Sequence, residues 1–239
     1  MQFSIATLLS QLSEDKLVAP KLLEKKLDCQ DAEDFDQLQI ALDALERIGV
    51  IEKDRGKYRR SALDAVVEAK LRCSSKGFCF AIQDIEDAED IYVRESQLGS
   101  AWNGDRALVR VTKEASRRRS PEGEVVVILE RSNPSLLAQV KHTSEHGYRA
   151  VPLDDRLLFE LELKQDEDIL KTAVDQLVHV EVRRYPLGHQ PPLGEVTRVL
   201  GSDAEEAADI DIVCCKHDLP RTFPERVLAA IEDLPAAEL

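Results

Sequence analysis

Apolar side chains recur every three or four positions along the first 48 residues, the spacing that places them on one side of an α-helix. Pro20 stands near the start of the second apolar stretch, where a missing N–H costs little. The third stretch begins with acidic residues and ends at Gly49, as helices commonly do. Three helices are therefore predicted, within the segments FSIATLLSQL, DKLVAPKLLEKKL and DAEDFDQLQIALDALERIGVIEK.

Two short runs around Asp54-Arg55-Gly56 follow the third helix and predict a hairpin with basic residues on its returning arm. Three helices and a basic hairpin favour a winged helix-turn-helix over residues 1–62. A helical protein-interaction module with a solvated hairpin stays open as the alternative. The wing residues that would contact structured RNA are Arg55, Lys57, Arg59 and Arg60.

From about residue 65 to residue 204 the pattern changes to short β-type runs separated by turns. Five runs precede residue 135, and five more follow it. Five strands per unit predict two successive Greek-key barrels of the OB or cold-shock type, at residues 65–135 and 136–204. The two units end alike, in GDRALVRV…PEGEVVVILER and DQLVHVEVRR…PPLGEVTRVLG, so an internal repeat of about 70 residues is also predicted. The predicted fold class is thus multidomain α+β.

The composition fits the predicted division into domains, but the net charge argues against the nucleic-acid binding that the fold suggests. The 239 residues are 43% apolar and 33% charged, which suits two or three small globular domains. The net charge of −14 counts against nucleic-acid binding, which needs a basic surface. Much of the excess of acidic over basic residues lies at the end of the chain, and residues 205–239 are predicted to be an acidic linker. Local basic clusters such as SRRRS, residues 116–120, survive elsewhere.

The remaining candidate signals are weak. No apolar run is long enough to span a bilayer, and the N-terminus lacks a basic region, so neither a membrane partner nor a signal peptide is expected. Five irregularly spaced cysteines predict reduced thiols in a cytoplasm-like compartment. Cys214, Cys215 and His217 lack a second Cys/His pair at zinc-type spacing, so no metal site is expected.

The segment KGFCFAIQD raises a sharper question, because Phe78 and Phe80 point to the same face of a predicted strand. They could be core residues or a stacking platform for single-stranded nucleic acid. Together with DIYVRESQLGSAWNGDRALVRV, the segment resembles a cold-shock domain. In this resemblance Lys76, Phe78 and Phe80 hold positions of the first RNA-binding motif, and Tyr92 and Arg94 hold two positions of the second.

The resemblance has departures. Single-domain cold-shock proteins usually have Gly between the two Phe residues and His then Phe in the second motif, where this chain has Cys79, Arg94 and Glu95. The expected platform is therefore thinner, with Arg94 able to stack or to pair with a phosphate. The candidate RNA contacts are Lys76, Phe78, Phe80, Tyr92, Arg94, Arg117, Arg118 and Arg119.

The order of LGSAWNGDRALVRV, PEGEVVVILERSNPSLLAQV, PPLGEVTRVLG and KHDLPRTFPERVL resembles the N-terminal half of RNase II/RNase R-type exoribonucleases. The resemblance implies 3′-to-5′ cleavage of RNA with Mg²⁺ held by clustered aspartates in a catalytic domain, followed by an S1 domain. No such cluster occurs in this sequence. The chain is therefore expected to be an N-terminal fragment without catalytic residues, metal or cofactor of its own, with Mg²⁺ expected in the absent catalytic domain.

The favoured hypothesis is an RNA-feeding half of an exoribonuclease, with single-stranded RNA as its partner and structured RNA as a second one at the wing. A bacterial cytoplasm or an organelle is the location that the family implies. A stand-alone nucleic-acid-binding or RNA-chaperone protein and a protein-interaction module stay open as alternatives. The sequence predicts no oligomeric state.

Overall fold

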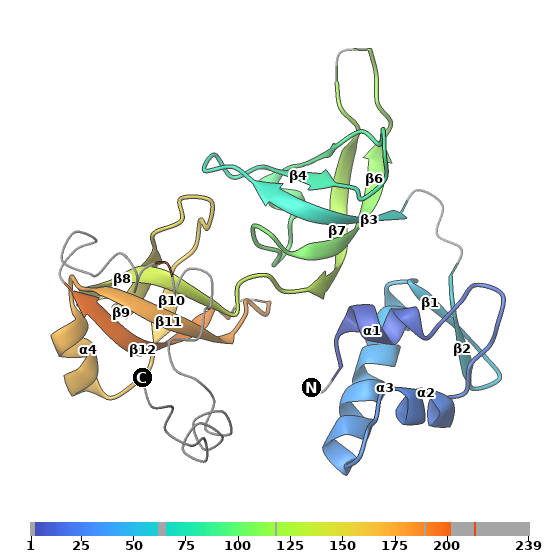
Figure 1. The fold of residues 1–239 in the computed structure, drawn as a ribbon, viewed down its shortest axis with the longest axis horizontal. Helices are drawn as coiled ribbons and strands as arrows, with labels where there is room; N and C mark the ends of the chain where they lie inside the picture. Colours follow the sequence, from blue (N-terminus) through green and yellow to red (C-terminus); the bar gives the residue numbers. More distant parts are fainter. Residues whose placement is uncertain (1–2, 62–65, 118, 189, 202–212, 214–239) are drawn as a thin grey trace, which may run out of the picture. The chain divides into compact units, whose positions relative to one another are not determined.

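A computed structural model describes residues 3–61, 66–117, 119–188, 190–201 and 213. The chain divides into two compact units (Figure 1). One comprises Met1–Asn133 with Asp155–Leu157, and the other comprises Pro134–Asp154 with Leu158–Leu239. Most of the described elements are β-strands, gathered into two closed barrels.

Three helices open the chain, as predicted. Ser4 caps the first by accepting a hydrogen bond from the Thr7 N–H, and Asp31 caps the third by accepting one from the Asp34 N–H. Pro20 is the first residue of the second helix. The helices are α1 (Ile5–Ser10), α2 (Pro20–Lys26) and α3 (Ala32–Arg47).

The predicted hairpin follows, as β1 (Ile51–Asp54) and β2 (Lys57–Arg60). Its two-residue turn has positive φ at both central positions, Arg55 at 47° and Gly56 at 76°, which matches the twist of the strands it joins. Tyr58, almost fully buried, pairs with Val18 across the hairpin edge and fastens it to the helices.

The first barrel closes in the order β3-β4-β5-β7-β6. All neighbours are antiparallel except β5 and β7, which run parallel and close the barrel. Side chains alternate along the strands, so that Leu71, Ala81 and Val109 fill the interior. The elements are β3 (Val66–Cys73), β4 (Cys79–Ile82), β5 (Ile91–Val93), the 3₁₀-helix η1 (Glu95–Gln97), β6 (Arg106–Lys113) and β7 (Glu122–Glu130).

The second barrel has the same connectivity, with β10 and β12 as its parallel pair. A helix, which the sequence pattern did not predict, replaces the 3₁₀-turn of the first barrel. The elements are β8 (Ser135–Thr143), β9 (Gly147–Pro152), β10 (Leu161–Leu163), α4 (Glu167–Ala173), β11 (Leu177–Arg184) and β12 (Leu193–Gly201).

Two glycines reveal how closely the barrels correspond. A Cβ atom on Gly123 would lie 2.8 Å from both Ile91 Cγ2 and Val109 Cγ1, and one on Gly194 would lie 2.5 Å from Val180 Cγ1 and 3.1 Å from Leu161 Cδ2. Each glycine sits where the parallel pair closes, so the close approach is the same in both units. The recurrence accords with the predicted internal repeat.

The cysteine prediction is wrong for two residues, because Cys73 and Cys79 form a disulfide. They face each other in the register of β3 and β4, across a turn that the sequence pattern did not resolve. Cys29 is a free, half-buried thiol, and burial raises its pKa, with Asp34 contributing. Cys214 and Cys215 lie outside the described residues.

Among the described helices, none is both long and apolar enough to cross a membrane.

Candidate nucleic-acid interface

One row of side chains runs across the outside of the first barrel. Strand register pairs Arg72 with Phe80, Phe80 with Tyr92, Tyr92 with Glu122, and Glu122 with Lys113. Directly paired residues project to the same face of a sheet. The row therefore contains two aromatic rings flanked by charged side chains.

Phe78 joins these two rings to form a cluster. Its ring centroid lies 6.0 Å from that of Phe80 and 5.6 Å from that of Tyr92, and the Phe80 and Tyr92 centroids are 5.7 Å apart. All three side chains are half-buried, whereas Cys79 and Ala81, the neighbours of Phe80 on β4, are fully buried. The aromatic cluster is thus on the outer face of the barrel and leaves ring surface for stacking.

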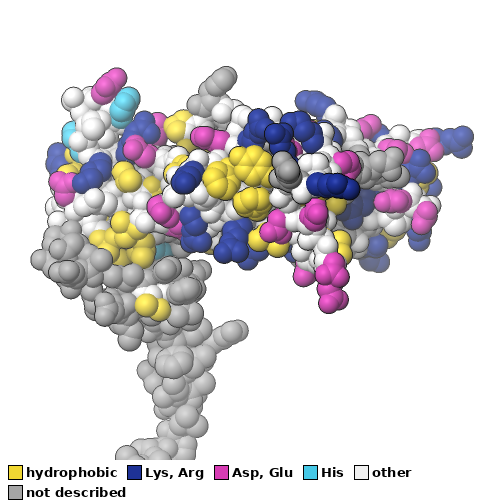
Figure 2. All heavy atoms as spheres, turned by 90° about the horizontal axis from the view of Figure 1, so that it is seen from above, with side chains coloured by type: hydrophobic (Ala, Val, Ile, Leu, Met, Phe, Trp, Pro, Cys, Tyr) yellow, Lys and Arg dark blue, Asp and Glu magenta, His cyan; other side chains and the backbone are white. Residues whose placement is uncertain are grey.

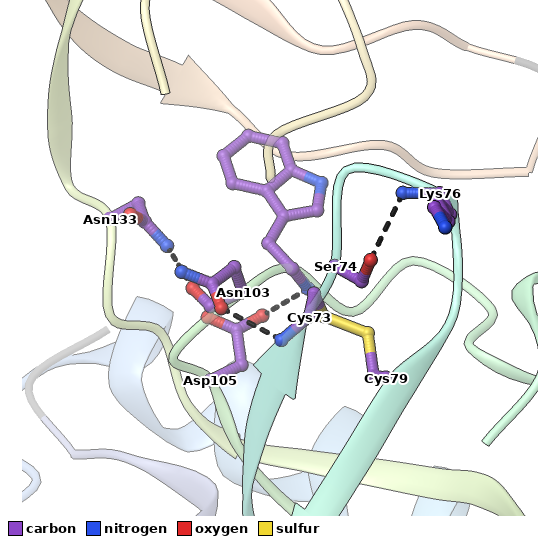
Figure 3. Close-up of a disulfide and its surroundings, with 8 residues drawn as sticks. Cys73, Ser74, Lys76, Cys79, Asn103, Asp105 and Asn133 are labelled. Carbon is purple, nitrogen blue, oxygen red and sulfur yellow. Dashed lines mark hydrogen bonds between the residues drawn. A yellow bond between two sulfur atoms is a disulfide. The ribbon is translucent and has the colours of Figure 1, made fainter. Parts of the chain in front are cut away.

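The turn between β3 and β4 presents part of this cluster. Gly77, at a φ of 86°, allows the chain to reverse, and the Ser74 N–H donates to the Phe78 carbonyl oxygen at 2.9 Å. The disulfide closes the base of the turn (Figure 3). Lys76 is exposed at its tip, and its backbone N–H donates to Ser74 Oγ.

A buried carboxylate supports the turn from behind. Asp105, fully buried, accepts from the Trp102 N–H, the Ser132 N–H and Arg131 Nη1, each at 2.9 Å. It fixes the loop in which Asn103 Oδ1 accepts from the Cys73 N–H at 2.9 Å (Figure 3). The end of β3 is therefore positioned by hydrogen bonds as well as by the disulfide.

Arg94 is in an ion pair with a neighbouring carboxylate. Its Nη2 lies 3.2 Å from both carboxylate oxygens of Glu122, and Lys113 Nζ lies 2.8 Å from one of them. The hydrogen bond from Lys113, with the charge of Arg94, holds the pKa of Glu122 below its usual range. Arg94 is thus beside the aromatic cluster, as expected, but is already neutralised.

The arginine loop lies between β6 and β7. Ser116 and Arg119 exchange backbone hydrogen bonds at its base, and Arg117 and Arg119 are exposed. Arg118 lies outside the described residues. A shallow hollow lies between this loop and residues 88–90, in the connection from β4 to β5.

Figure 2 shows one face of the molecule on which hydrophobic side chains gather between Lys and Arg side chains.

Arg72 is a candidate that the sequence analysis missed. It is exposed, directly opposite Phe80, and no ion pair to it is found within the described part of the chain. The sequence feature that could have revealed Arg72 is the alternation in KLRC, which puts Arg72 on the outer face while Leu71 faces the core. Register between β3 and β4 was needed to place it beside the rings.

The second barrel carries no comparable aromatic row among its described residues. The equivalent register places Arg149 and Glu162 where the first barrel has Phe80 and Tyr92. Glu162 is also in an ion pair, since Lys164 Nζ lies 2.9 Å from its carboxylate. One aromatic contact lies at the β8–β9 turn, where the ring centroids of His142 and Tyr148 are 4.3 Å apart. The row consists of Lys141, Arg149, Glu162, Leu193 and Arg184.

The basic residues of the β1–β2 hairpin are only partly available. Arg59 pairs with Glu52 at 2.7 Å, and Arg60 is half-buried. Arg55 and Lys57 are exposed at the turn and after it.

Within the described ranges, no three His, Cys, Asp or Glu side chains come close enough to hold a metal ion. Cys214, Cys215 and His217 are outside the described residues.

Three family models match the chain in sequence order. They are the cyanobacterial RNase R N-terminal domain at residues 6–61, the ribonuclease B OB domain at 69–128 and the cold shock domain at 151–224. The chain is 66% identical over 235 residues to the acetazolamide conferring resistance protein zam of Synechocystis sp., covering 98% of this chain and 30% of that protein. It is 31% identical over 229 residues to ribonuclease R of Thermotoga maritima, covering 94% and 31%.

Solved structures share the fold. Mycoplasma genitalium RNase R in complex with ribose methylated single-stranded RNA has a TM-score of 0.58 at 16% identity, covering 72% of this chain and 27% of that one. Yeast Ssd1, a pseudonuclease, has a TM-score of 0.52 at 16% identity, covering 64% and 25%. The chain spans about a third or less of these relatives. Taken together, the ordered domain matches show that the chain belongs to the RNase R family and corresponds to its N-terminal domain series.

Proposed function

We propose that this chain binds single-stranded RNA and feeds it to the catalytic part of a Mg²⁺-dependent 3′-to-5′ exoribonuclease. The aromatic cluster of Phe78, Phe80 and Tyr92 on the outer face of the first barrel is the observation that carries the proposal. Base–aromatic stacking tolerates any sequence, because every base has a π-face. Such tolerance suits an enzyme that must move RNA of any sequence along its surface to the catalytic part.

Charge would hold the backbone while the rings hold bases. Lys76 and Arg72 flank the cluster, and Arg117 and Arg119 stand in the arginine loop. The solved RNase R in complex with single-stranded RNA supports RNA as the ligand class. In the second barrel the charged row would contact phosphates without stacking.

The helices and hairpin would form a winged helix-turn-helix over residues 1–62, followed by barrels at 65–135 and 136–204. Arg55 and Lys57 would be its contacts to structured RNA, with Arg59 and Arg60 contributing less, since one is ion-paired and the other is half-buried.

The experiment is a fluorescence-anisotropy titration of the full chain with 5′-labelled single-stranded RNA. Phe78→Ala, Phe80→Ala and Tyr92→Ala should each weaken binding by about 1–3 kcal/mol, the usual contribution of one base–aromatic stack. Phe35→Ala is the matched control, because Phe35 is an exposed phenylalanine on α3 and does not belong to the row. It should leave binding unchanged.

Circular dichroism must stay native for each variant. If the three variants bind as tightly as the parent chain, or lose binding only in proportion to unfolding, the rings are packing residues and the proposal is wrong.

A further inference from the structure

Glu122 occupies an unusual position at the edge of the aromatic cluster. It begins β7, with Tyr92 opposite it on one side and Lys113 on the other. Its carboxylate accepts hydrogen bonds from both Arg94 and Lys113, at 3.2 and 2.8 Å. Arg94 and Lys113 therefore share one anion beside Tyr92.

These three charged side chains line a hollow of about 240 Å³, which Tyr92 also lines. A second carboxylate, Glu124, borders the hollow but is paired with Arg110 at 2.8 Å. Arg94 follows the end of β5 in extended backbone, two residues after Tyr92, which places the two about 7 Å apart on the same side of the chain. An RNA strand stacked on Tyr92 would bring its phosphates to the two cations. The Glu122 carboxylate occupies the position between the two cations where such a phosphate would bind.

Exposure distinguishes the partners in this ion cluster. The side chain of Glu122 is 21% exposed, whereas those of Arg94 and Lys113 are 58% and 63% exposed. The carboxylate is thus held against the strand, while the long cationic side chains extend into solvent and have room to turn. Exposed ion pairs of this kind are weak and exchange readily.

Its pKa, lowered first by the hydrogen bond from Lys113, keeps Glu122 ionised near neutral pH. The competing negative charge is therefore always present when RNA arrives.

We propose that Glu122 is a built-in competitor of the RNA phosphate: it occupies Arg94 and Lys113 until a backbone phosphate replaces it. The inference rests on the proposed RNA binding and adds how that binding is kept weak. Exchanging one anion for another gains little affinity, so the backbone contact breaks easily. A strand that must advance step by step benefits from such a contact, because tight binding would hold it in place.

The test compares Glu122→Gln with the parent chain in anisotropy titrations against a short 5′-labelled oligouridylate at several salt concentrations. Glu122→Gln should bind about three- to tenfold more tightly. The slope of log K against log salt should steepen by up to about 0.7 for each phosphate bound at Arg94 and Lys113, because in the parent chain the displaced carboxylate takes up a cation and offsets the counterion that the RNA releases. A merely structural ion pair would leave that slope unchanged.

Glu130→Gln is the matched control. It removes the same charge from the far end of the same strand, where Glu130 pairs with Arg106 at 3.2 Å. It should change neither affinity nor slope by a comparable amount. If Glu122→Gln loses its native circular dichroism, Glu122→Asp, which draws the charge back from both cations, should give the same changes at smaller size.

The outcomes separate the two proposals. Equal or weaker binding by a folded Glu122→Gln chain, with the parent chain binding RNA, would overturn the competitor alone. Absence of binding by every protein in the series would overturn the proposed function and the competitor together.

Discussion

Asp105 shows how much one buried side chain contributes to the candidate interface. It is fully buried and accepts hydrogen bonds from Arg131 and from two backbone N–H groups. Removing a buried carboxylate leaves its donors without an acceptor in a place that water does not reach. The loop that holds the end of β3 depends on this one acceptor.

We expect Asp105→Ala to lower the free energy of unfolding of the first unit by about 3–5 kcal/mol, the range found when one partner of a buried pair is removed. Trp102, the one tryptophan of the chain, lies beside Asp105 and reports the transition by its fluorescence in a urea titration. Glu130→Ala, which breaks an exposed ion pair, should cost at most about 1 kcal/mol. Equal losses in the two variants would contradict the assigned role.

The residue scale also shows where sequence reasoning stops. Periodicity placed Phe78 and Phe80 on one face, the cold-shock resemblance added Tyr92, and the structure brings the three rings into contact. Arg72 was missed because its nearness to Phe80 depends on strand register. The pairing of Arg94 with Glu122 was missed for the same reason, since 28 residues separate them in the chain.

At the scale of elements, the β3–β4 hairpin combines a covalent and a hydrogen-bonded closure. The Cys73–Cys79 bond spans six residues and encloses the turn that carries Lys76 and Phe78. Closing so short a loop restricts the unfolded chain only modestly. The hairpin should therefore persist without the bond, but less stably.

Reduction, or the double change Cys73→Ser/Cys79→Ser, should lower the unfolding free energy of the first unit by about 2 kcal/mol, as loop-closure entropy predicts for a loop of this length. The measurement is again Trp102 fluorescence in urea, with and without a reductant. Cys29→Ser is the control, because Cys29 is a free thiol and its loss should preserve the response to reductant. A parent chain whose stability ignores reductant, and whose cysteines all alkylate without it, would disprove the disulfide.

The predicted elements succeeded where local pattern decides and failed where it does not. Helical spacing and capping residues located α1, α2 and α3, and β-type runs located the barrel strands. Helix α4 was missed, since it is short and lies between two strand patterns. The disulfide was missed because an irregular cysteine spacing says nothing about which strands will be neighbours.

At the scale of the whole molecule, the domain series follows the RNase R family, yet the described residues offer no carboxylate set for a metal. Stacking and ion pairing bind substrate and product alike, and uniform binding does not raise a turnover rate. Phosphodiester cleavage needs charge stabilisation in the transition state, commonly by metal ions.

We therefore expect the purified chain to bind 5′-labelled single-stranded RNA without shortening it, with or without Mg²⁺ or Mn²⁺. Gel electrophoresis of the labelled strand is the measurement, and a full-length RNase R is the positive control. Shortening that disappears when one of this chain's own carboxylates is replaced would reveal a nuclease site and contradict the expectation.

Closure of both barrels has a consequence for pairing between two similar β-domains on one chain. Two similar β-domains on one polypeptide are at high effective concentration, a situation that favours strand exchange between neighbours. In each barrel the parallel pair, β5 with β7 or β10 with β12, completes the ring and leaves no described barrel strand with an unpaired edge. Without such edges, neighbouring copies have no template for pairing. The glycine at each closing pair lets the two strands approach closely, so it also helps to keep those strand edges paired.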